Sequence, residues 1–461
     1  MNQAFQDRRW FLRTAATGFG YTAFAGLAAL DALRAKDFEN PLRPKQPHFA
    51  PQAKRVILLF MQGGPTQHDT FDYNPDLLKH AGQIAEGKMT SGTQKGKILP
   101  SVFEFKPSGE SGIPISEVFP NLRQHADDLC LLNGMHTDTP AHAPASIFAH
   151  TGSITFVRPS MGSWIVYGLG TESQDLPGFV TINPPPAGGS SLYGSAFLPA
   201  TYQGTRLNVT DGQEPIENIR NSRMGFDLQR KQLDYVQELN KGLLDRTEAA
   251  SQVEGVIQSY ELAFRMQRAV PTTLDLSTEP ESTRDMYGLN EEATRSFGTQ
   301  CLLARRMAEQ GVRFIEIGHR GWDHHNDLRK RLADNAKATD KPIAALIEDL
   351  KRRGMFKETL IVWGGEFGRS TVEQNDKSDG RRHNNRGYTM WMAGGGIKGG
   401  MRFGKCDEHG VAVEDRVHLH DLHATMLHQL GLDHTKLTYR YAGRDFRLTD
   451  VHGRVVNEII A

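Results

Sequence analysis

The chain of 461 residues has few cysteines, no excess of charge of either sign and no internal repeat. Its three cysteines, Cys130, Cys301 and Cys406, lack the close CxxC spacing of thiolate metal sites, and one must stay unpaired within a monomer. Any metal is therefore expected on histidines and carboxylates. Lysine plus arginine and aspartate plus glutamate both number 54, so no strong field favours nucleic acid as a partner. A small, local ligand is the better expectation.

The first 36 residues have the pattern of a targeting signal. Asp-Arg-Arg-Trp-Phe-Leu-Arg at residues 7–13 precedes an uncharged, mostly apolar stretch from Thr14 to Leu30. This pattern resembles a twin-arginine export signal, which predicts the periplasm, the cell envelope or secretion. Asp7 departs from the usual Ser or Thr. The stretch is weaker than the roughly 20 strongly apolar residues that span a bilayer, so a membrane anchor comes second, and no later segment is apolar enough to cross a membrane.

The rest of the chain alternates between two patterns. After a polar linker over residues 37–53, one domain is expected over residues 54–461. Continuous apolar runs typical of buried strands lie at Arg55–Met61, Leu129–Met135, Phe179–Asn183, Val312–Gly318, Thr359–Gly365 and Tyr388–Gly396. Helical patterns include Glu291–Gln310 and Lys341–Arg353, and a charged segment at about 222–268 reads as a helical insertion. The alternation predicts an α/β fold with a largely parallel central sheet and helices on both faces.

Four polar clusters follow the expected strand ends, where ligands gather in open α/β sheets. They contain His68 and Asp69; His142; Asp323, His324 and His325; and Glu366 and Arg369, followed by Arg381-Arg382-His383-Asn384-Asn385-Arg386. One such cluster is more often a solvated loop or a helix cap. Four together predict a divalent metal, with Zn²⁺, Mn²⁺ or Ca²⁺ as the candidates.

The second and fourth clusters suit an anion. Pro144 and Gly152 bracket a short helix and place His142 near its N-cap, where the backbone N–H groups favour an anion or a nucleophile that attacks one. A structural cap is the alternative. Arg369, Arg382 and Arg386 could donate charge-assisted hydrogen bonds to phosphate or sulfate oxygens, although some are expected to be bystanders.

These residues carry a resemblance to a known family over the chain from about Lys54. LFMQGGPTQHDTFD, PSMGSWIVYGLG, GWDHHND, WGGEFGRS and the run before YTMWMAGGG resemble the secreted sulfatase-like family of domain of unknown function 1501, in the alkaline phosphatase superfamily. The resemblance implies a dinuclear metal site, a nucleophile at a helix N-terminus and hydrolysis of phosphate or sulfate esters of a small molecule or glycan. It implies Asp323 and His325 as metal ligands, Glu366 in place of a usual Asp, and His383 as the late His ligand.

Two departures touch the implied catalytic centre. His142 stands at the nucleophile position, in a frame completed by Pro144 and Thr151-Gly152, and could be a metal ligand, a covalent nucleophile or a general base. Gln62-Gly63 follows the first strand where a metal-binding Asp is usual, and the nearest acid is Asp69. Two functions therefore stand open, a metal-dependent ester hydrolase and a non-catalytic, metal-retaining binding protein of the cell envelope. A phosphomutase-like activity and a formylglycine-type sulfatase are disfavoured.

Overall fold

A computed structural model describes residues 40–89, 92–210, 215–216, 219, 224–244, 250–375 and 378–461. The expected export signal at residues 1–36 and the start of the linker lie outside this part of the chain. Contacts divide the chain into Met1–Asn40 and Pro41–Ala461, and the fold described below is that of the second unit. Among the described residues, no helix has the length and apolar character needed to cross a membrane.

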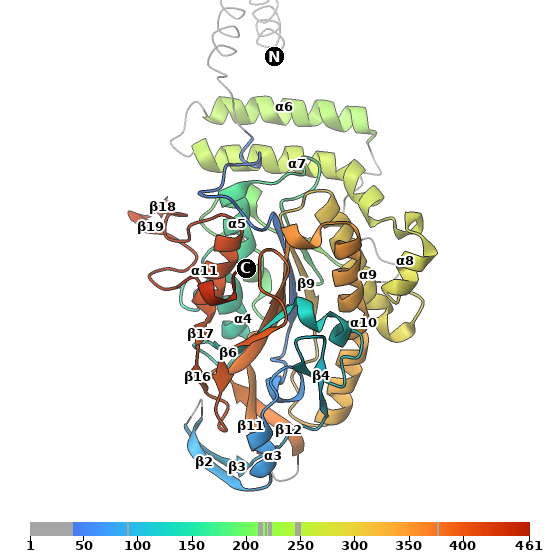
Figure 1. Ribbon diagram of the computed structural model, residues 1–461. Helices are drawn as coiled ribbons and strands as arrows, with labels where there is room; N and C mark the ends of the chain where they lie inside the picture. The colour runs from blue at the N-terminus through green and yellow to red at the C-terminus, as the bar shows by residue number, and fades with distance from the viewer. Residues whose placement is uncertain are drawn as a thin grey trace, which may run out of the picture. The chain divides into compact units, whose positions relative to one another are not determined.

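The core of this unit is a nine-stranded sheet (Figure 1). Its main path has the order β14-β6-β13-β10-β1-β9-β7-β8, and β17 pairs with β6 off this path. Among the described strands of this central sheet, β13 alone runs antiparallel to its neighbours. The strands are β1 (Arg55–Met61), β6 (Leu129–His136), β7 (Phe179–Ile182), β8 (Thr205–Leu207), β9 (Phe314–His319), β10 (Thr359–Gly364), β13 (Tyr388–Ala393), β14 (Met401–Phe403) and β17 (Val417–His418).

Helices cover both faces of this sheet, which confirms the predicted α/β class. Figure 1 shows α9 (Glu292–Glu309) and α10 (Leu328–Arg352) on one side and α4 (His142–Thr151), α5 (Met161–Leu169) and α11 (Leu419–Gln429) on the other. Burial on both faces explains the apolar runs, because all residues of β1, β7, β10 and β13 are buried. The other α-helices among the described residues are α3 (Pro75–Lys79), α6 (Phe226–Leu244), α7 (Ala250–Leu274) and α8 (Glu281–Met286).

In the part of the chain that the structure describes, five two-stranded hairpins lie outside the central sheet. They pair β2 (Ile84–Met89) with β3 (Gly92–Lys97), β4 (Phe105–Ser108) with β5 (Ile113–Ser116), β11 (Gly368–Asn375) with β12 (Ser378–Asn384), β15 (Lys405–Cys406) with β16 (Ala412–Glu414), and β18 (Tyr439–Tyr441) with β19 (Arg444–Phe446). The β11–β12 hairpin was not expected, because its strands are rich in polar and charged residues and lack an apolar run. It carries Arg369 and His383 as a cross-strand pair.

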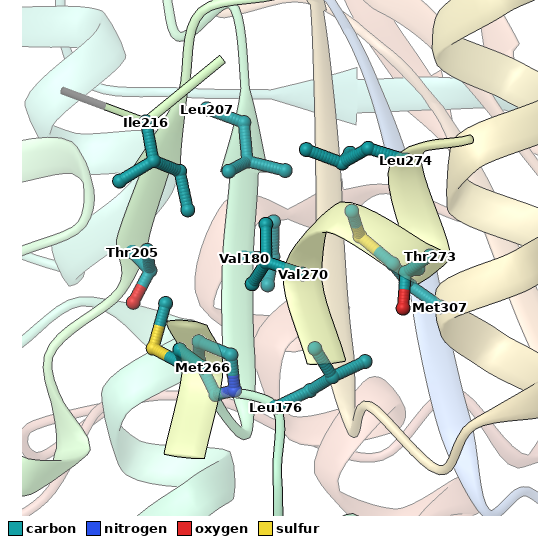
Figure 2. Close-up of a pocket in the computed structure, with 11 residues that line it drawn as sticks. Leu176, Val180, Thr205, Leu207, Ile216, Met266, Val270, Thr273, Leu274 and Met307 are labelled. Atoms are coloured by element: carbon teal, nitrogen blue, oxygen red, sulfur yellow. The ribbon is translucent and has the colours of Figure 1, made fainter. Parts of the chain in front are cut away.

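The charged segment read as an insertion contains α6 and α7. α7 packs on the edge of the sheet through Met266 and Val270, which line a small apolar pocket together with Leu176 and Val180 (Figure 2). Leu176 lies three residues before the start of β7, so this contact is at the amino end of the strand. The candidate site lies at the opposite, carboxyl ends of the strands, and α7 therefore does not cover it.

Two element boundaries differ from expectation. α10 begins at Leu328, well before the predicted Lys341, because Leu328, Leu332 and Ala336 continue its buried face. α4 has Ala141 as its N-cap, so His142 is the first helical residue rather than the cap. Gly152 ends that helix with a positive φ of 66°, the left-handed conformation that glycine adopts most readily.

Candidate metal centre

The carboxyl ends of four strands supply the candidate site. His142 opens α4 after β6, Asp323 lies between β9 and α10, and Glu366 lies between β10 and β11. Gly63 follows β1, which lies between β9 and β10 in the sheet. His383 arrives from the β12 strand of the added hairpin. The order of the strands therefore brings together residues that are far apart in the sequence.

A close backbone approach joins the end of β1 to the Asp323 segment. A Cβ atom on Gly63 would lie 2.4 Å from the Asp323 nitrogen, and Gly63 has a φ of +121°. The Trp322 N–H also donates to the Gln62 carbonyl oxygen at 3.1 Å. Only glycine allows this spacing, so the Gln62-Gly63 sequence that replaces the expected Asp serves to seat the Asp323 loop.

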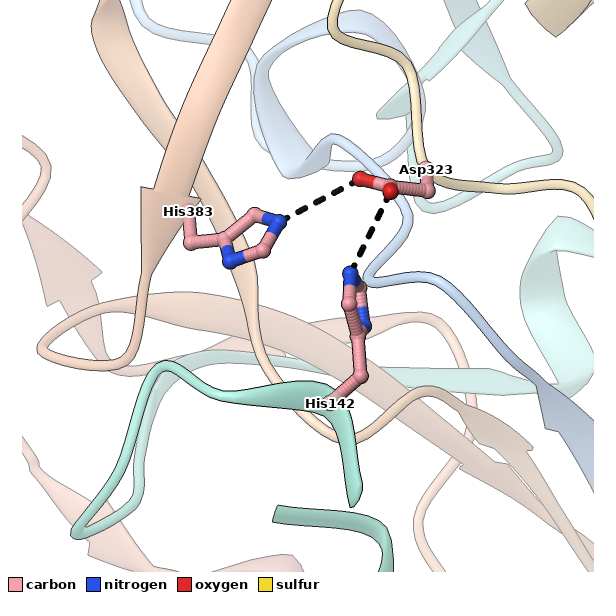
Figure 3. Close-up of side chains that lie close together, drawn as sticks. All are labelled: His142, Asp323 and His383. Atoms are coloured by element: carbon pink, nitrogen blue, oxygen red, sulfur yellow. Dashed lines mark hydrogen bonds and ion pairs between the residues drawn. The ribbon is translucent and has the colours of Figure 1, made fainter. Parts of the chain in front are cut away.

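The Asp323 carboxylate is the centre of the cluster (Figure 3). Its Oδ1 atom lies 3.0 Å from Nε2 of His325 and 3.2 Å from Nε2 of His383. Its Oδ2 atom lies 3.4 Å from Nε2 of His142. Of the Asp323 side chain, 40% is exposed, so the cluster is open to solvent on one side.

Glu366 holds the other side of the His142 ring. Nδ1 of His142 lies 2.6 Å from Oε1 of Glu366, which is fully buried. The Gly63 N–H donates to both carboxylate oxygens of Glu366, at 3.0 and 3.2 Å. With a proton on Nδ1 for this hydrogen bond, Nε2 is left as the atom that faces Asp323.

Charge in the cluster moves two pKa values in opposite directions. Burial would lower the pKa of His142, but the carboxylates of Asp323 and Glu366 raise it to about 9. Burial would raise the pKa of Asp323, but hydrogen bonds from the three histidines and the charge of Arg369 hold it far below its ordinary value. Both values describe the cluster without a metal ion.

The donor set of the cluster fits a divalent cation. One nitrogen each from His142 and His383 and one oxygen of Asp323 lie within 4.8 Å of one another. Nε2 of His142 is buried and lies 3.4 Å from Oδ2 of Asp323. An imidazole nitrogen beside a carboxylate and a second imidazole is the ligand chemistry of Zn²⁺ or Mn²⁺. A carboxylate behind the ring, as Glu366 stands behind His142, is a common outer partner of a ligating histidine.

The two candidate arginines, Arg369 and Arg382, differ in burial and in the groups that they contact. Arg369 is fully buried, contacts Oδ1 of Asp323, and donates to the carbonyl oxygens of Gly63, Gly64 and Arg381. Its guanidinium therefore ties the β1 end to the cluster. Arg382 is half-buried, and its Nε donates to the Gln374 carbonyl oxygen at 3.0 Å.

His68 and Asp69 lie apart from this cluster. Both are buried, and the Asp69 carboxylate accepts from Arg381 at 2.7 and 3.2 Å, from Thr66 at 2.6 Å and from the Val102 N–H at 2.9 Å. His68 lies 2.9 Å from the Gln67 amide nitrogen through its Nε2. These contacts give Asp69 a structural partner, and neither residue is in the ligand set proposed below.

Sequence reasoning missed the groups that orient the cluster. The Pro140 carbonyl oxygen lies 2.8 Å from Nδ1 of His383 and fixes that ring. Glu366, expected at a ligand position, lies 2.6 Å from Nδ1 of His142. Neither contact has a local signal, because the chain separates His383 from Pro140 by 243 residues and Glu366 from His142 by 224.

Fold and site together define an α/β protein with a His/Asp cluster, fit for a divalent cation, at the carboxyl ends of its parallel strands. The chain belongs to the family described as protein of unknown function (DUF1501), whose model matches residues 53–460. This match confirms the resemblance drawn from the motifs. A comparison with curated proteins gives no match.

The solved structures that the chain resembles include a synthase, a monoester hydrolase and a sulfatase. A lipoteichoic acid synthase from Listeria monocytogenes has a TM-score of 0.37 at 10% identity, over 89% of this chain and 78% of its own. A phosphonate monoester hydrolase from Silicibacter pomeroyi has a TM-score of 0.37 at 11% identity, over 82% and 73%. A sulfatase from Pseudoalteromonas sp. has a TM-score of 0.35 at 13% identity, over 88% and 70%.

Proposed function

We propose that this chain is an exported, metal-dependent hydrolase of sulfate or phosphate esters. One observation carries the proposal, the convergence of His142, Asp323 and His383 at the carboxyl ends of the strands, with their ligand atoms within 4.8 Å. The twin-arginine pattern supports export to the periplasm or cell envelope. The open face of the cluster supports access for a small-molecule or glycan ester.

His142, Asp323, His383 and His325 would hold the cation. When bound, a divalent cation would supply a Lewis acid that polarises an oxygen of the ester. Nitrogen donors in the set favour Zn²⁺ or Mn²⁺ over Ca²⁺, which prefers oxygen ligands.

The chain's own residues would orient and neutralise the charges. Glu366 accepts a hydrogen bond from Nδ1 of His142 and thereby directs Nε2 toward Asp323 and the cation that the cluster would hold. Arg369 holds Asp323 and acts as a positioning residue, because its guanidinium is buried and engaged. Arg382 stays the candidate for contact with the anionic group of the substrate.

Elemental analysis of the purified protein tests the proposal. We expect about one or two equivalents of Zn²⁺ or Mn²⁺ in the wild type, since the cluster offers three or four ligands. The double variant Asp323→Ala/His383→Ala should lose the metal and all turnover on a panel of sulfate and phosphate esters. Asp334→Ala, which removes an exposed aspartate of α10, is the matched control and should change neither. Absence of metal from the wild type, purified without chelator, would end the proposal.

The contact between Arg369 and Asp323 favours a second candidate, a non-catalytic binding protein of the cell envelope. A buried guanidinium neutralises part of the charge that a metal would otherwise balance. A protein of this kind keeps the cluster but turns over no ester. Turnover that disappears in Asp323→Ala rules it out, whereas bound metal without turnover on the whole panel favours it.

A further inference from the structure

A second cleft lies away from the candidate metal centre. It has a volume of about 640 Å³. Its lining comes from Val157 and Arg158, which precede α5, from the segment after β7 and from the β18–β19 hairpin. Figure 1 shows this hairpin beside α5 and α11. None of the residues of the His/Asp cluster lines the cleft.

The cleft holds a buried arginine with free hydrogen-bonding capacity. Arg158 lines the cleft, and only 7% of the residue is exposed. Its Nη2 pairs with Oδ2 of Asp450 at 3.2 Å. Its Nε and Nη1 make no hydrogen bond to any described residue. A buried N–H donor without an acceptor costs folding free energy. A ligand oxygen that accepted from Nε or Nη1 of Arg158 would remove this cost.

Charges around Arg158 are unequal. Asp450 pairs with both Arg158 and Arg444, and its carbonyl oxygen accepts from Arg447. Two guanidinium groups therefore share one carboxylate, and a third binds the main chain of the same residue, which leaves a local excess of positive charge. The ligand that balances this excess carries an anionic oxygen.

Rings and hydroxyls complete the lining. Phe197 stacks on Tyr441 with centroids 5.1 Å apart, and on Tyr439 with centroids 6.0 Å apart. Tyr441 is 49% exposed and so offers ring surface to a ligand. Ser191, Ser195 and Gln203 add hydroxyl and amide groups to the same lining. Flat aromatic surface beside such groups suits a sugar ring, which has apolar faces and a polar rim.

We propose that this cleft binds an anionic saccharide, a sugar ring that bears a carboxylate or a sulfate group. Arg158 binds the anionic group, and the Phe197–Tyr441 stack supports the ring. This binding site is independent of the metal centre and of the proposed ester hydrolysis.

Isothermal titration of the full chain in the presence of EDTA tests the proposal. The probes are a hyaluronan tetrasaccharide with carboxylates, a heparin tetrasaccharide with sulfates, neutral chitotetraose and inorganic sulfate. We expect at least one charged tetrasaccharide to bind roughly tenfold more tightly than chitotetraose and sulfate, as a charge-assisted hydrogen bond would give. The preferred probe identifies the anionic group as carboxylate or sulfate.

Variants locate the binding. Arg158→Gln should weaken it about tenfold, and Tyr441→Ala about threefold, by loss of stacking. Tyr260→Ala is the matched control, because Tyr260 is also 49% exposed but lies on α7. If Arg158→Gln does not fold, the saccharide affinities of Tyr441→Ala and Tyr260→Ala are compared instead. Equal binding of neutral and charged sugars, binding that EDTA abolishes, or binding unchanged in Tyr441→Ala would each overturn the proposal.

Discussion

At the residue scale, the His142 ring is held between two carboxylates with different tasks. Glu366 is fully buried and bonds Nδ1, whereas Asp323 is partly exposed and faces Nε2. A buried carboxylate behind an imidazole raises its basicity and fixes its tautomer. Glu366 therefore orients the His142 ring, and Asp323 faces the nitrogen that is proposed to bind the cation.

Replacing Glu366 by Gln should weaken metal binding about 10- to 100-fold, because a neutral amide orients His142 less firmly. Titration of the metal-free protein with Zn²⁺ measures the change. Glu348→Gln on the exposed side of α10 is the control and should leave the affinity unchanged. Equal affinities in the wild type and Glu366→Gln would show that Glu366 does not support the site.

Burial also decides how much an ion pair contributes to the free energy of unfolding. Asp69 and Arg381 are both fully buried, whereas Lys330 and Asp334 are 79% and 62% exposed. Arg381→Met should lower the free energy of unfolding by about 3–5 kcal/mol, because it leaves a buried carboxylate unpaired. Lys330→Met should cost less than about 1 kcal/mol. Urea unfolding of both variants checks the contrast, and similar losses would contradict it.

At the scale of elements, the junction after β1 lies against the Asp323 segment of the candidate metal centre. Gly63→Ala places a methyl group against the backbone of Trp322 and Asp323, neither of which can yield as a side chain would. We expect a loss of more than about 1–3 kcal/mol, the usual cost of a strained φ alone, together with weaker metal binding.

Gly82 offers the matched control for this junction. Its φ is +74°, also positive, but an added Cβ would meet nothing within 4 Å. Gly82→Ala should therefore show only the cost of the φ angle and keep full metal affinity. Urea unfolding and Zn²⁺ titration measure both effects, and equal losses in the two variants would show that contact with the Asp323 segment is unimportant.

At the scale of the whole molecule, several histidines with lowered pKa values make stability depend on pH. Burial lowers the pKa of His68 to about 3, of His319 to about 4 and of His423 to about 3, from an ordinary value of 6.5. Below pH 6.5 the unfolded chain takes up protons on these side chains and the folded chain does not. Each should lower stability by up to about 1.4 kcal/mol per pH unit between about pH 6 and 4.

His142 does not oppose this trend, since its raised pKa of about 9 leaves it charged in both states across that window. Urea midpoints at pH 7, 6, 5 and 4 measure the slope. His423→Gln keeps a donor for the Ala149 carbonyl oxygen, which lies 2.8 Å from Nε2 of His423. Its slope should be smaller by about 1.4 kcal/mol per pH unit, and an unchanged slope would contradict the assignment.

The sequence alone determined the fold class and the main strands. Arg55–Met61 forms β1 at the predicted bounds, and Thr359–Gly365 forms β10 to within one residue. A strand buried on both faces must be apolar along its whole length, so its signal is local. The same logic placed Asp323, Glu366 and His142 after strands, at the edge where ligands gather.

Only the tertiary structure decided which polar side chains meet. The β11–β12 hairpin has no apolar run, yet it delivers His383 to Asp323 and Arg381 to Asp69. Asp69 and Arg381 lie 312 residues apart, and no local pattern in the sequence indicates their pairing. The apolar character of each residue indicates in the sequence itself whether that residue is buried. A contact between polar groups depends instead on the order of the strands and on the direction of each side chain.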